Sequence, residues 1–171
     1  FSVMANTLRG VYGTDVLLAT ANSFTGSVLQ ADYNKKMAAS MIMPNGLMSR
    51  QRTMTGAELK ETVRAFVEGC EGGFVPFNRG SLPVVSGIAV EVKEAGGSYT
   101  LTGITRNGQP LRDDDTVTVT CLATAKQMAP LLADKSAGFT GGDQQVKSTW
   151  TEVVSGGGAA LAEPENYMTL R

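Results

Sequence analysis

The chain has 171 residues, of which 42% are hydrophobic and 18% are charged, and its formal net charge is −1. This length and composition allow a buried core and favour one globular domain. The near-neutral charge, without any run of Lys or Arg, excludes the usual footprint of a nucleic-acid binder, and no apolar segment approaches the roughly 20 residues that cross a bilayer. We therefore expect no nucleic-acid partner and no membrane insertion.

The chain contains no histidine and only two cysteines, Cys70 and Cys121. Without a Cys-x-x-Cys spacing or any histidine, the sequence predicts no metal site in this chain. Two thiols fit either one disulfide in an exported protein or two buried free cysteines, and both alternatives stay open.

The first residue, Phe1, is neither an initiator methionine nor the start of a signal peptide, so we interpret the sequence as a fragment of a longer protein.

The first third of the chain alternates between helical and strand patterns. Phe1 to Tyr12 places apolar residues at helical spacing, and Asp15 to Thr20 is a short apolar run that predicts a buried strand. Asn22 to Gly26 is expected to form a loop, followed by a short helix over Asn34 to Ser40. The apolar segment Met41 to Gly46 is expected to end in a turn.

The clearest local prediction is a helix that opens at Thr55. Glu58 follows three positions later, which is the spacing of a capping box. Gly69 is expected to end this helix. Its apolar face consists of Leu59, Val63, Phe66 and Val67.

The second half begins with a Gly- and Pro-rich segment, Glu71 to Pro83, which is expected to be a loop. Gly96-Gly97 and Asn107-Gly108 are then predicted to form turns between strands. The predicted strands are Val84 to Lys93, Tyr99 to Arg106 and Thr116 to Leu122.

Two more helices are predicted near the C-terminus, over Ala123 to Ala133 and over Ser148 to Val154. The final residues, Tyr167 to Arg171, are expected to form an edge strand or a tail. The alternation of element types predicts an α+β fold in which a mixed sheet and packed helices form a single compact domain over residues 1–171.

Several short motifs occur in an order typical of one family. The strand that ends at Thr20 is followed by the loop Asn22 to Gly26, the turn Pro44-Asn-Gly46 and the Thr-Gly helix start at Thr55. Later motifs in the same order are Ser86-Gly-Ile88, Asn107-Gly-Gln-Pro-Leu111 and Gly141-Gly-Asp143. Over nearly its whole length, the chain resembles the C-terminal domain of the 5'-nucleotidase, UDP-sugar hydrolase and 2',3'-cyclic-nucleotide phosphodiesterase family.

This resemblance implies that the chain holds a substrate and has no catalytic residues of its own. In the family, a separate N-terminal domain of the same polypeptide carries the divalent metals and performs hydrolysis, so no cofactor is expected in this chain. The implied ligand is a nucleotide or nucleoside-type small molecule. Family members are usually exported or held at the cell surface, which implies an extracytoplasmic location.

The resemblance also implies a set of ligand contacts. Asp143, after two glycines, is suited to bind the vicinal hydroxyls of a ribose through its two carboxylate oxygens, although a Gly-Gly-Asp sequence is also common as a plain turn or helix N-cap. The predicted substrate-binding residues are Asn22, Asn45, Phe139, Gly141, Gly142 and Asp143.

The sequence departs from the family where the ligand is expected to bind. Thr25 occupies the position of the family's substrate-gripping Arg, and Asn45 and Ala137 occupy the positions of its two stacking aromatic rings. Because an offset-stacked pair contributes about 0.5–1.5 kcal/mol beyond area burial, losing both rings weakens base binding. Phe139, two residues beyond Ala137, would replace one ring if the loop shifted.

Other candidate residues have a simpler explanation. Asp113-Asp-Asp115 lacks the spaced oxygen ligands and the glycine of a calcium loop and is expected to be a solvated turn. Ser86 and Ser136 have no histidine to activate them, so a nucleophilic hydrolase is not supported. A relocated ligand site or plain core packing would explain Phe74, Phe77, Arg79, Arg50 and Arg52.

Two hypotheses result. The chain is either the substrate-specificity domain of an exported nucleotidase-type phosphoesterase, or a degenerate binding or structural module that has lost nucleotide recognition.

Overall fold

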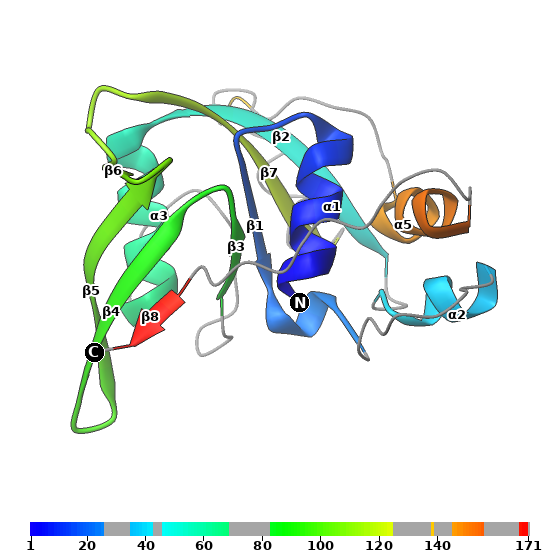
Figure 1. Cartoon of the computed structure of the whole chain (residues 1–171), viewed down its shortest axis with the longest axis horizontal. Helices are drawn as coiled ribbons and strands as arrows, with labels where there is room; N and C mark the ends of the chain where they lie inside the picture. The colour runs from blue at the N-terminus through cyan, green and yellow to red at the C-terminus, as the bar shows by residue number, and fades with distance from the viewer. Residues whose placement is uncertain are drawn as a thin grey trace.

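The computed structural model describes residues 1–25, 35–42, 46–68, 83–124, 138, 145–155 and 168–170 of the chain. Figure 1 shows the elements in chain order. They are α1 (Ser2–Tyr12), β1 (Val16–Thr20), the 3-10 helix η1 (Ala21–Ser23), α2 (Lys35–Ser40), β2 (Leu47–Thr55), α3 (Gly56–Glu68), β3 (Pro83–Ser86), β4 (Ala89–Ala95), β5 (Ser98–Arg106), β6 (Gln109–Pro110), β7 (Thr116–Thr124), α5 (Val146–Ser155) and β8 (Met168–Leu170).

The strands form two four-stranded mixed sheets. The central sheet has the order β2-β7-β1-β3, in which β1 and β7 are parallel and the other pairs are antiparallel. The second sheet has the order β6-β5-β4-β8, in which β4 and β8 are parallel. The predicted α+β fold with mixed strand pairing is therefore confirmed, and the strands divide between two sheets.

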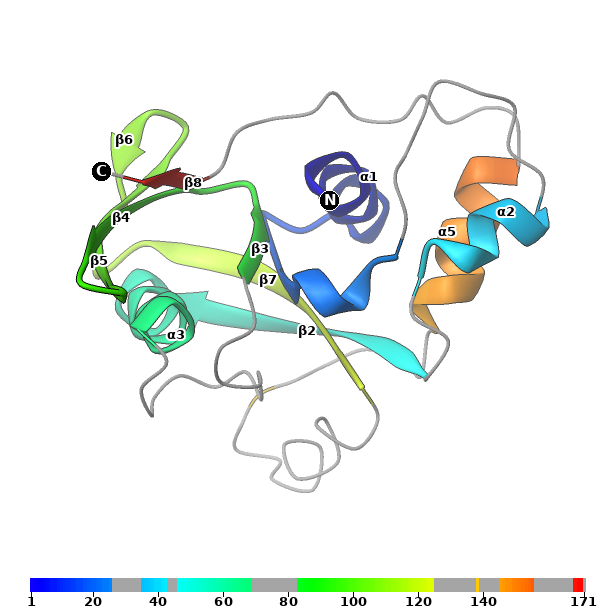
Figure 2. The ribbon, with the colours of Figure 1, turned by 90° about the horizontal axis from the view of Figure 1, so that it is seen from below.

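Helices cover both faces of the central sheet. Figure 2 shows α1 on one face and α3 on the other, with α2 and α5 side by side beyond the start of β2. Alternate residues of β1 consequently face different cores: Val16 and Leu18 belong to the core shared with α3 and the second sheet, and Leu17 and Ala19 belong to the core shared with α1, α2 and α5. A strand buried on both faces requires a continuous apolar run, and this explains the Val-Leu-Leu-Ala sequence of β1.

Most of the helix predictions are confirmed with small shifts in their ends. α1 ends as expected after Tyr12, because Gly13 adopts a left-handed φ of 65° and its N–H bonds to the carbonyls of Arg9 and Gly10. The capping box of α3 is formed: Thr55 N–H donates to Glu58 Oε2 at 2.9 Å, and Glu58 N–H donates to Thr55 Oγ1 at 3.2 Å. The short helix α2 and the helix α5 also match their predicted positions.

The strand predictions require three corrections. β2 was not expected, because its sequence Leu-Met-Ser-Arg-Gln-Arg-Thr-Met-Thr lacks apolar alternation; pairing with β7 along its full length, from Leu47 with Thr124 to Thr55 with Thr116, forms it. The strand predicted over Val84 to Lys93 is two strands, β3 and β4, in different sheets. Ala123 and Thr124, predicted to open a helix, end β7, and the rest of that helix lies outside the described residues.

The predicted turns are confirmed by their backbone angles. Gly96 and Gly97 have φ values of 60° and 82°, and Asn107 and Gly108 have 52° and 75°, which suits a two-residue hairpin loop. The C-terminal segment forms an edge strand, β8, beside β4. In the part of the chain that the structure describes, no helix has the length and hydropathy to span a bilayer.

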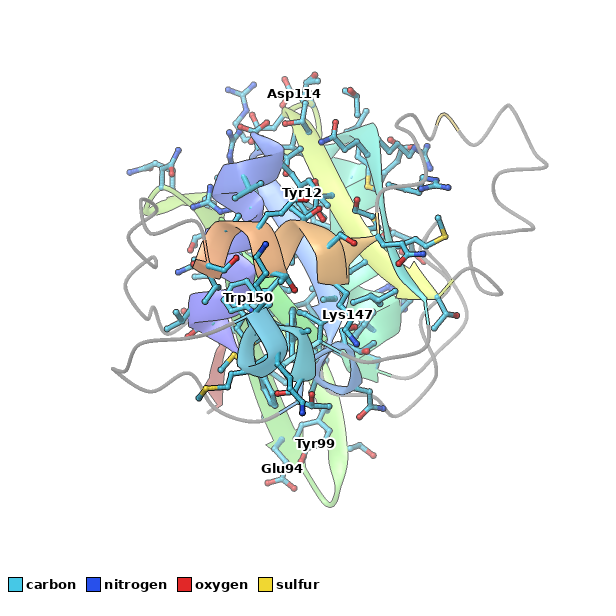
Figure 3. All side chains as sticks on the ribbon, turned by 90° about the vertical axis from the view of Figure 1, so that its right-hand side faces the viewer. Tyr12, Glu94, Tyr99, Asp114, Lys147 and Trp150 are labelled. Carbon is cyan, nitrogen blue, oxygen red and sulfur yellow. The ribbon has the colours of Figure 1, made fainter. Side chains whose placement is uncertain are left out.

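Figure 3 labels residues at two opposite ends of the molecule. Glu94 and Tyr99 lie at the tip of the β4–β5 hairpin, and Asp114 lies at the opposite end. Trp150, the one tryptophan in the sequence, lies on α5 and is fully buried in the core with α1 and α2. The position of Trp150 fixes the α2 and α5 pair to the central sheet.

Candidate functional site

The candidate site lies at the end of the central sheet where β1 and β7 finish, which we call the loop end. β1 finishes at Thr20 opposite Pro83, the first residue of β3, and β7 finishes at Thr124 opposite Leu47, the first residue of β2. Because β1 and β7 run parallel, these four strand ends lie at the same end of the central sheet. The chain connections that carry the predicted ligand residues therefore start or finish at the loop end.

Asn22 is the one predicted ligand residue that falls within the described part of the chain. It lies in η1, directly after β1, and its side chain is exposed. The turn around it is fixed by the Phe24 N–H, which donates to the Ala21 carbonyl at 3.1 Å, and by the hydroxyls of Thr20 and Ser23, which are 3.2 Å apart. The structure thus places Asn22 at the surface of the loop end.

Asn45, Phe139, Gly141, Gly142 and Asp143 lie outside the described residues. The described residues nearest to Asn45 and Asp143, Gly46 and Gln145, indicate where the chain carrying them joins the described structure. Gly46 follows Asn45 directly and precedes β2, with a φ of 67°. Gln145, two residues after Asp143, forms an antiparallel bridge with Met48 of β2. Both attachment points lie next to the start of β2, and therefore at the loop end.

Gly138, the residue before Phe139, lies close to Arg52 of β2. It has a φ of 70° and is exposed, and a Cβ atom at this position would lie 3.8 Å from Nε of Arg52. Arg52 Nη2 donates to Glu58 Oε1 at 2.7 Å, and the Arg52 side chain is 9% exposed. Since Glu58 already pairs with this guanidinium, the contact favours a packing role for Arg52 over a relocated ligand site.

Thr25, at the position of the family's Arg, is bonded to the chain segment that precedes β2. Its N–H donates to the Met41 carbonyl at 2.7 Å, and its hydroxyl donates to the Ser40 carbonyl. The adjacent Phe24 pairs with Ile42 in an antiparallel bridge. Thr25 therefore joins two backbone segments, which its short hydroxyl can do and a ligand-directed guanidinium would not.

An aromatic pair beside η1 was not anticipated from the sequence. The rings of Phe1 and Phe24 are stacked, with centroids 6.0 Å apart and an interplanar angle of 26°. Phe24 is 3% exposed, whereas Phe1 is 55% exposed. The two residues are distant in sequence, and Phe1 lies in an apolar helical pattern, so no sequence signal could have paired them.

The remaining polar candidates have structural partners. Asp113 pairs with Lys60 at 2.7 Å, Asp114 pairs with Arg112 at 2.7 Å, and both carboxylates are largely exposed, which confirms a solvated turn. Within the described ranges, no group of three or more His, Cys, Asp or Glu side chains is positioned to hold a metal ion.

Ser86 and Cys121 are both fully buried. Ser86 Oγ accepts a hydrogen bond from Arg9 Nε at 2.8 Å and donates to Asn6 Oδ1 at 2.6 Å, so it is a packing residue. Cys121 is a free cysteine, and burial raises the pKa of its thiol to about 12, although the charge of Arg52 acts in the opposite direction. Cys70 lies outside the described residues.

Three solved structures share this fold over nearly the whole chain. A 5'-nucleotidase precursor from Thermus thermophilus has a TM-score of 0.70 at 13% identity, with 99% of this chain and 34% of that protein covered. An NAD nucleotidase from Haemophilus influenzae gives 0.67 at 16% identity, with 98% and 32% covered. The sulfate thiohydrolase SoxB, also from Thermus thermophilus, gives 0.67 at 12% identity, with 99% and 31% covered.

The sequence comparisons give a different result. No protein-family model matches the chain, and no curated protein matches it. The chain spans about a third of the length of the solved proteins that it resembles, in the region of their C-terminal domain. At these identities the likeness concerns the fold, and it confirms that this chain has the fold of the 5'-nucleotidase C-terminal domain, as the order of motifs predicted.

Proposed function

We propose that this chain is the substrate-specificity domain of a nucleotidase-type phosphoesterase and binds a nucleotide or nucleoside at the loop end. One observation supports this proposal most directly: several separate chain connections meet at the loop end of the central sheet. The connections after β1, before β2 and before α5 begin or finish there. A ligand at the loop end would contact several loops held by one rigid sheet, which is a common arrangement in binding sites.

The roles in the proposed site follow from side-chain chemistry. The exposed Asn22 amide provides both a donor and an acceptor, which suits the polar edge of a base or a ribose hydroxyl. Asp143 is proposed to accept two hydrogen bonds from the vicinal hydroxyls of a ribose. Gly141 and Gly142 would permit close approach of the backbone, Phe139 would stack on the base, and Asn45 would line the opposite side.

Hydrolysis is proposed to require an N-terminal catalytic domain of the same polypeptide. The solved proteins described above are about three times as long as the chain, and two of them are nucleotidases. Such a domain would supply the divalent metals that activate water and polarise the phosphate, because this chain has no histidine and the described residues hold no metal-binding cluster. The chain by itself is therefore expected to bind and not to hydrolyse.

The test is a calorimetric titration of the chain with adenosine, AMP, UDP-glucose and NAD. We expect saturable binding of at least one ligand, weakened about tenfold or more by Asp143→Ala, because hydrogen bonds to a charged group are lost. Asp114→Ala is the matched control, since it removes an exposed carboxylate that lies in the turn before β7. Its affinity should equal that of the unchanged chain.

The second candidate function is a structural or protein-binding module without nucleotide recognition. Two contacts favour it: Thr25 bonds to the Ser40 carbonyl where the family has its gripping Arg, and Arg52 pairs with Glu58. An absence of binding at millimolar concentrations of all four ligands would contradict the first proposal and support this one. An equal loss of affinity in Asp143→Ala and Asp114→Ala would also contradict the proposed role of Asp143.

Export to the cell surface or the medium belongs to the same proposal. It rests on the usual location of the family that the sequence resembles. Fractionation of cells that express the full-length protein would test it, and recovery of the protein only with cytosolic markers would contradict it.

A further inference from the structure

A polar cleft of about 560 Å³ lies at the end of the central sheet where β1 begins, opposite to the loop end. We call it the arginine cleft. Arg9 at the end of α1, Asp15 before β1, and Arg106 and Asn107 at the end of β5 contribute to its walls. In Figure 1 these elements meet at the upper end of β1, where the β3–β4 connection passes beside it. The volume lies within the range of about 300–1,000 Å³ that is usual for small-molecule sites.

Arg9 is held at the cleft by a chain of buried polar groups. Its Nε donates to Ser86 Oγ at 2.8 Å, and Ser86 Oγ in turn donates to Asn6 Oδ1 at 2.6 Å. Ser86 is 0% exposed and Asn6 is 5% exposed. Arg9 Nη1 also approaches the Asp15 carbonyl at 3.5 Å. The guanidinium is therefore fixed in orientation before any ligand arrives.

Arg106 is held from the other side by Asp15. Its Nη2 pairs with Asp15 Oδ1, while Asp15 Oδ2 accepts hydrogen bonds from the N–H and the hydroxyl of Thr118, each at 2.8 Å. Burial would raise the pKa of the Asp15 carboxyl, but the Thr118 hydrogen bonds and the charges of Arg106 and Arg9 hold this pKa below its usual value. Asp15 is thus an anion with both oxygens engaged.

The charge of the cleft is then unbalanced. Its charged lining groups are Arg9, Arg106 and Asp15, which leaves one positive charge. Within the described part of the chain, Nη2 of Arg9 and Nε of Arg106 make no hydrogen bond. Guanidinium N–H groups of this kind match the oxygens of a carboxylate or a phosphate in geometry and charge.

We propose that the arginine cleft binds a small oxyanion with one negative charge, either a carboxylate or a phosphate monoanion, between Arg9 and Arg106. The two guanidinium groups come from different parts of the fold, Arg9 from α1 and Arg106 from the second sheet. A bound anion would therefore join α1 to the second sheet. This site is separate from the proposed nucleotide site, because the two lie at opposite ends of the central sheet, and each can fail without the other.

The test is an NMR titration of the whole chain with inorganic phosphate and, in parallel, with acetate, at constant ionic strength. We expect saturable shifts of the Gly87, Asn107 and Gly108 amides with at least one of the two probes. The probe that binds more tightly identifies the source as phosphate or carboxylate. An absence of saturable shifts with both probes at millimolar concentrations would overturn the proposal.

Two variants with equal charge change separate a specific site from general attraction. Arg106→Gln should weaken binding about tenfold or more, since a charge-assisted hydrogen bond is lost. Arg112→Gln, which removes an exposed guanidinium that is not part of the cleft lining, should leave the affinity within about twofold. Equal weakening by both variants would show non-specific attraction and would overturn the proposal.

A third variant keeps the test decisive if Arg106→Gln fails to fold. Asn107→Asp places a carboxylate at the wall of the cleft and retains the Arg106 and Asp15 pair, and aspartate tolerates the φ of 52° at this position. We expect weaker binding of the same probe because the added charge repels the anion. Unchanged affinity in Asn107→Asp would contradict the proposal.

Discussion

Gly87 is the residue at which the chain leaves the central sheet for the second sheet. It has a φ of 87°, and a Cβ atom there would lie 2.0 Å from the Asp15 carbonyl oxygen and 3.1 Å from Cδ of Arg9. Both the backbone conformation and the space therefore require glycine. The sequence pattern could not reveal this turn, since apolar alternation continues on both sides of it from Val84 to Lys93.

The predicted effect of Gly87→Ala is a large loss in the free energy of unfolding. Gly97→Ala is the matched control, because Gly97 has a similar φ of 82° but no atom within 4 Å of the added Cβ. We expect about 1 kcal/mol for the control, from backbone strain alone, and at least about 2 kcal/mol more for Gly87→Ala, from the clash with Asp15. Urea unfolding of both variants measures the difference. Equal losses would show that the space around Gly87 is not limiting.

At the scale of elements, the start of α3 combines local sequence and tertiary contacts. Thr55 and Glu58 exchange the two hydrogen bonds of the capping box, and Glu58 also pairs with Arg52 of β2. The capping box therefore fixes both the first turn of the helix and its position against the strand. Such local signals explain why this helix was predicted with nearly correct ends.

Thr55→Ala is expected to lower the free energy of unfolding by about 1 kcal/mol, because the Glu58 N–H loses its capping acceptor. Thr55→Ser retains the hydroxyl and should restore most of the stability. Glu61→Ala, on the exposed side of the same helix, should change stability by less than about 0.5 kcal/mol, since its pairing with Arg64 is exposed to solvent. Chemical unfolding compares the three variants, and a loss in Thr55→Ser equal to that in Thr55→Ala would contradict the role of the hydroxyl.

The elements that the sequence did not predict depend on distant partners. β2 has few apolar residues and contains Arg50 and Arg52, yet it forms because β7 provides a continuous antiparallel neighbour. The identity of that neighbour is not encoded within β2. Conversely, β1 was predicted correctly because burial on both faces is visible in its own sequence.

At the scale of the whole molecule, two cores share one sheet. The α3 core and the core formed with α1, α2 and α5 lie on opposite faces of the same strands, so neither can form without the central sheet. The candidate site depends on the same arrangement. The place of Asn22 just after β1 was predictable from the sequence, whereas the stacking of Phe1 on Phe24 requires α1 and η1 to be brought together by the fold.

We therefore predict that the chain unfolds in a single cooperative transition. Trp150 reports on the core formed with α1, α2 and α5, and far-ultraviolet circular dichroism reports on all elements. The two signals should give coincident curves in urea. An earlier change in tryptophan fluorescence would show that α2 and α5 separate from the central sheet before the rest unfolds.

The pairing of β8 with β4 has a consequence for synthesis on the ribosome. β4 comprises Ala89–Ala95, and its partner Met168–Leu170 is the last described strand of the chain, so many residues must be translated before the two can meet. Until then, one row of β4 backbone N–H and C=O groups has no strand beside it and is a template for pairing with another nascent chain. Truncation before Met168 should accordingly promote aggregation of the emerging polypeptide.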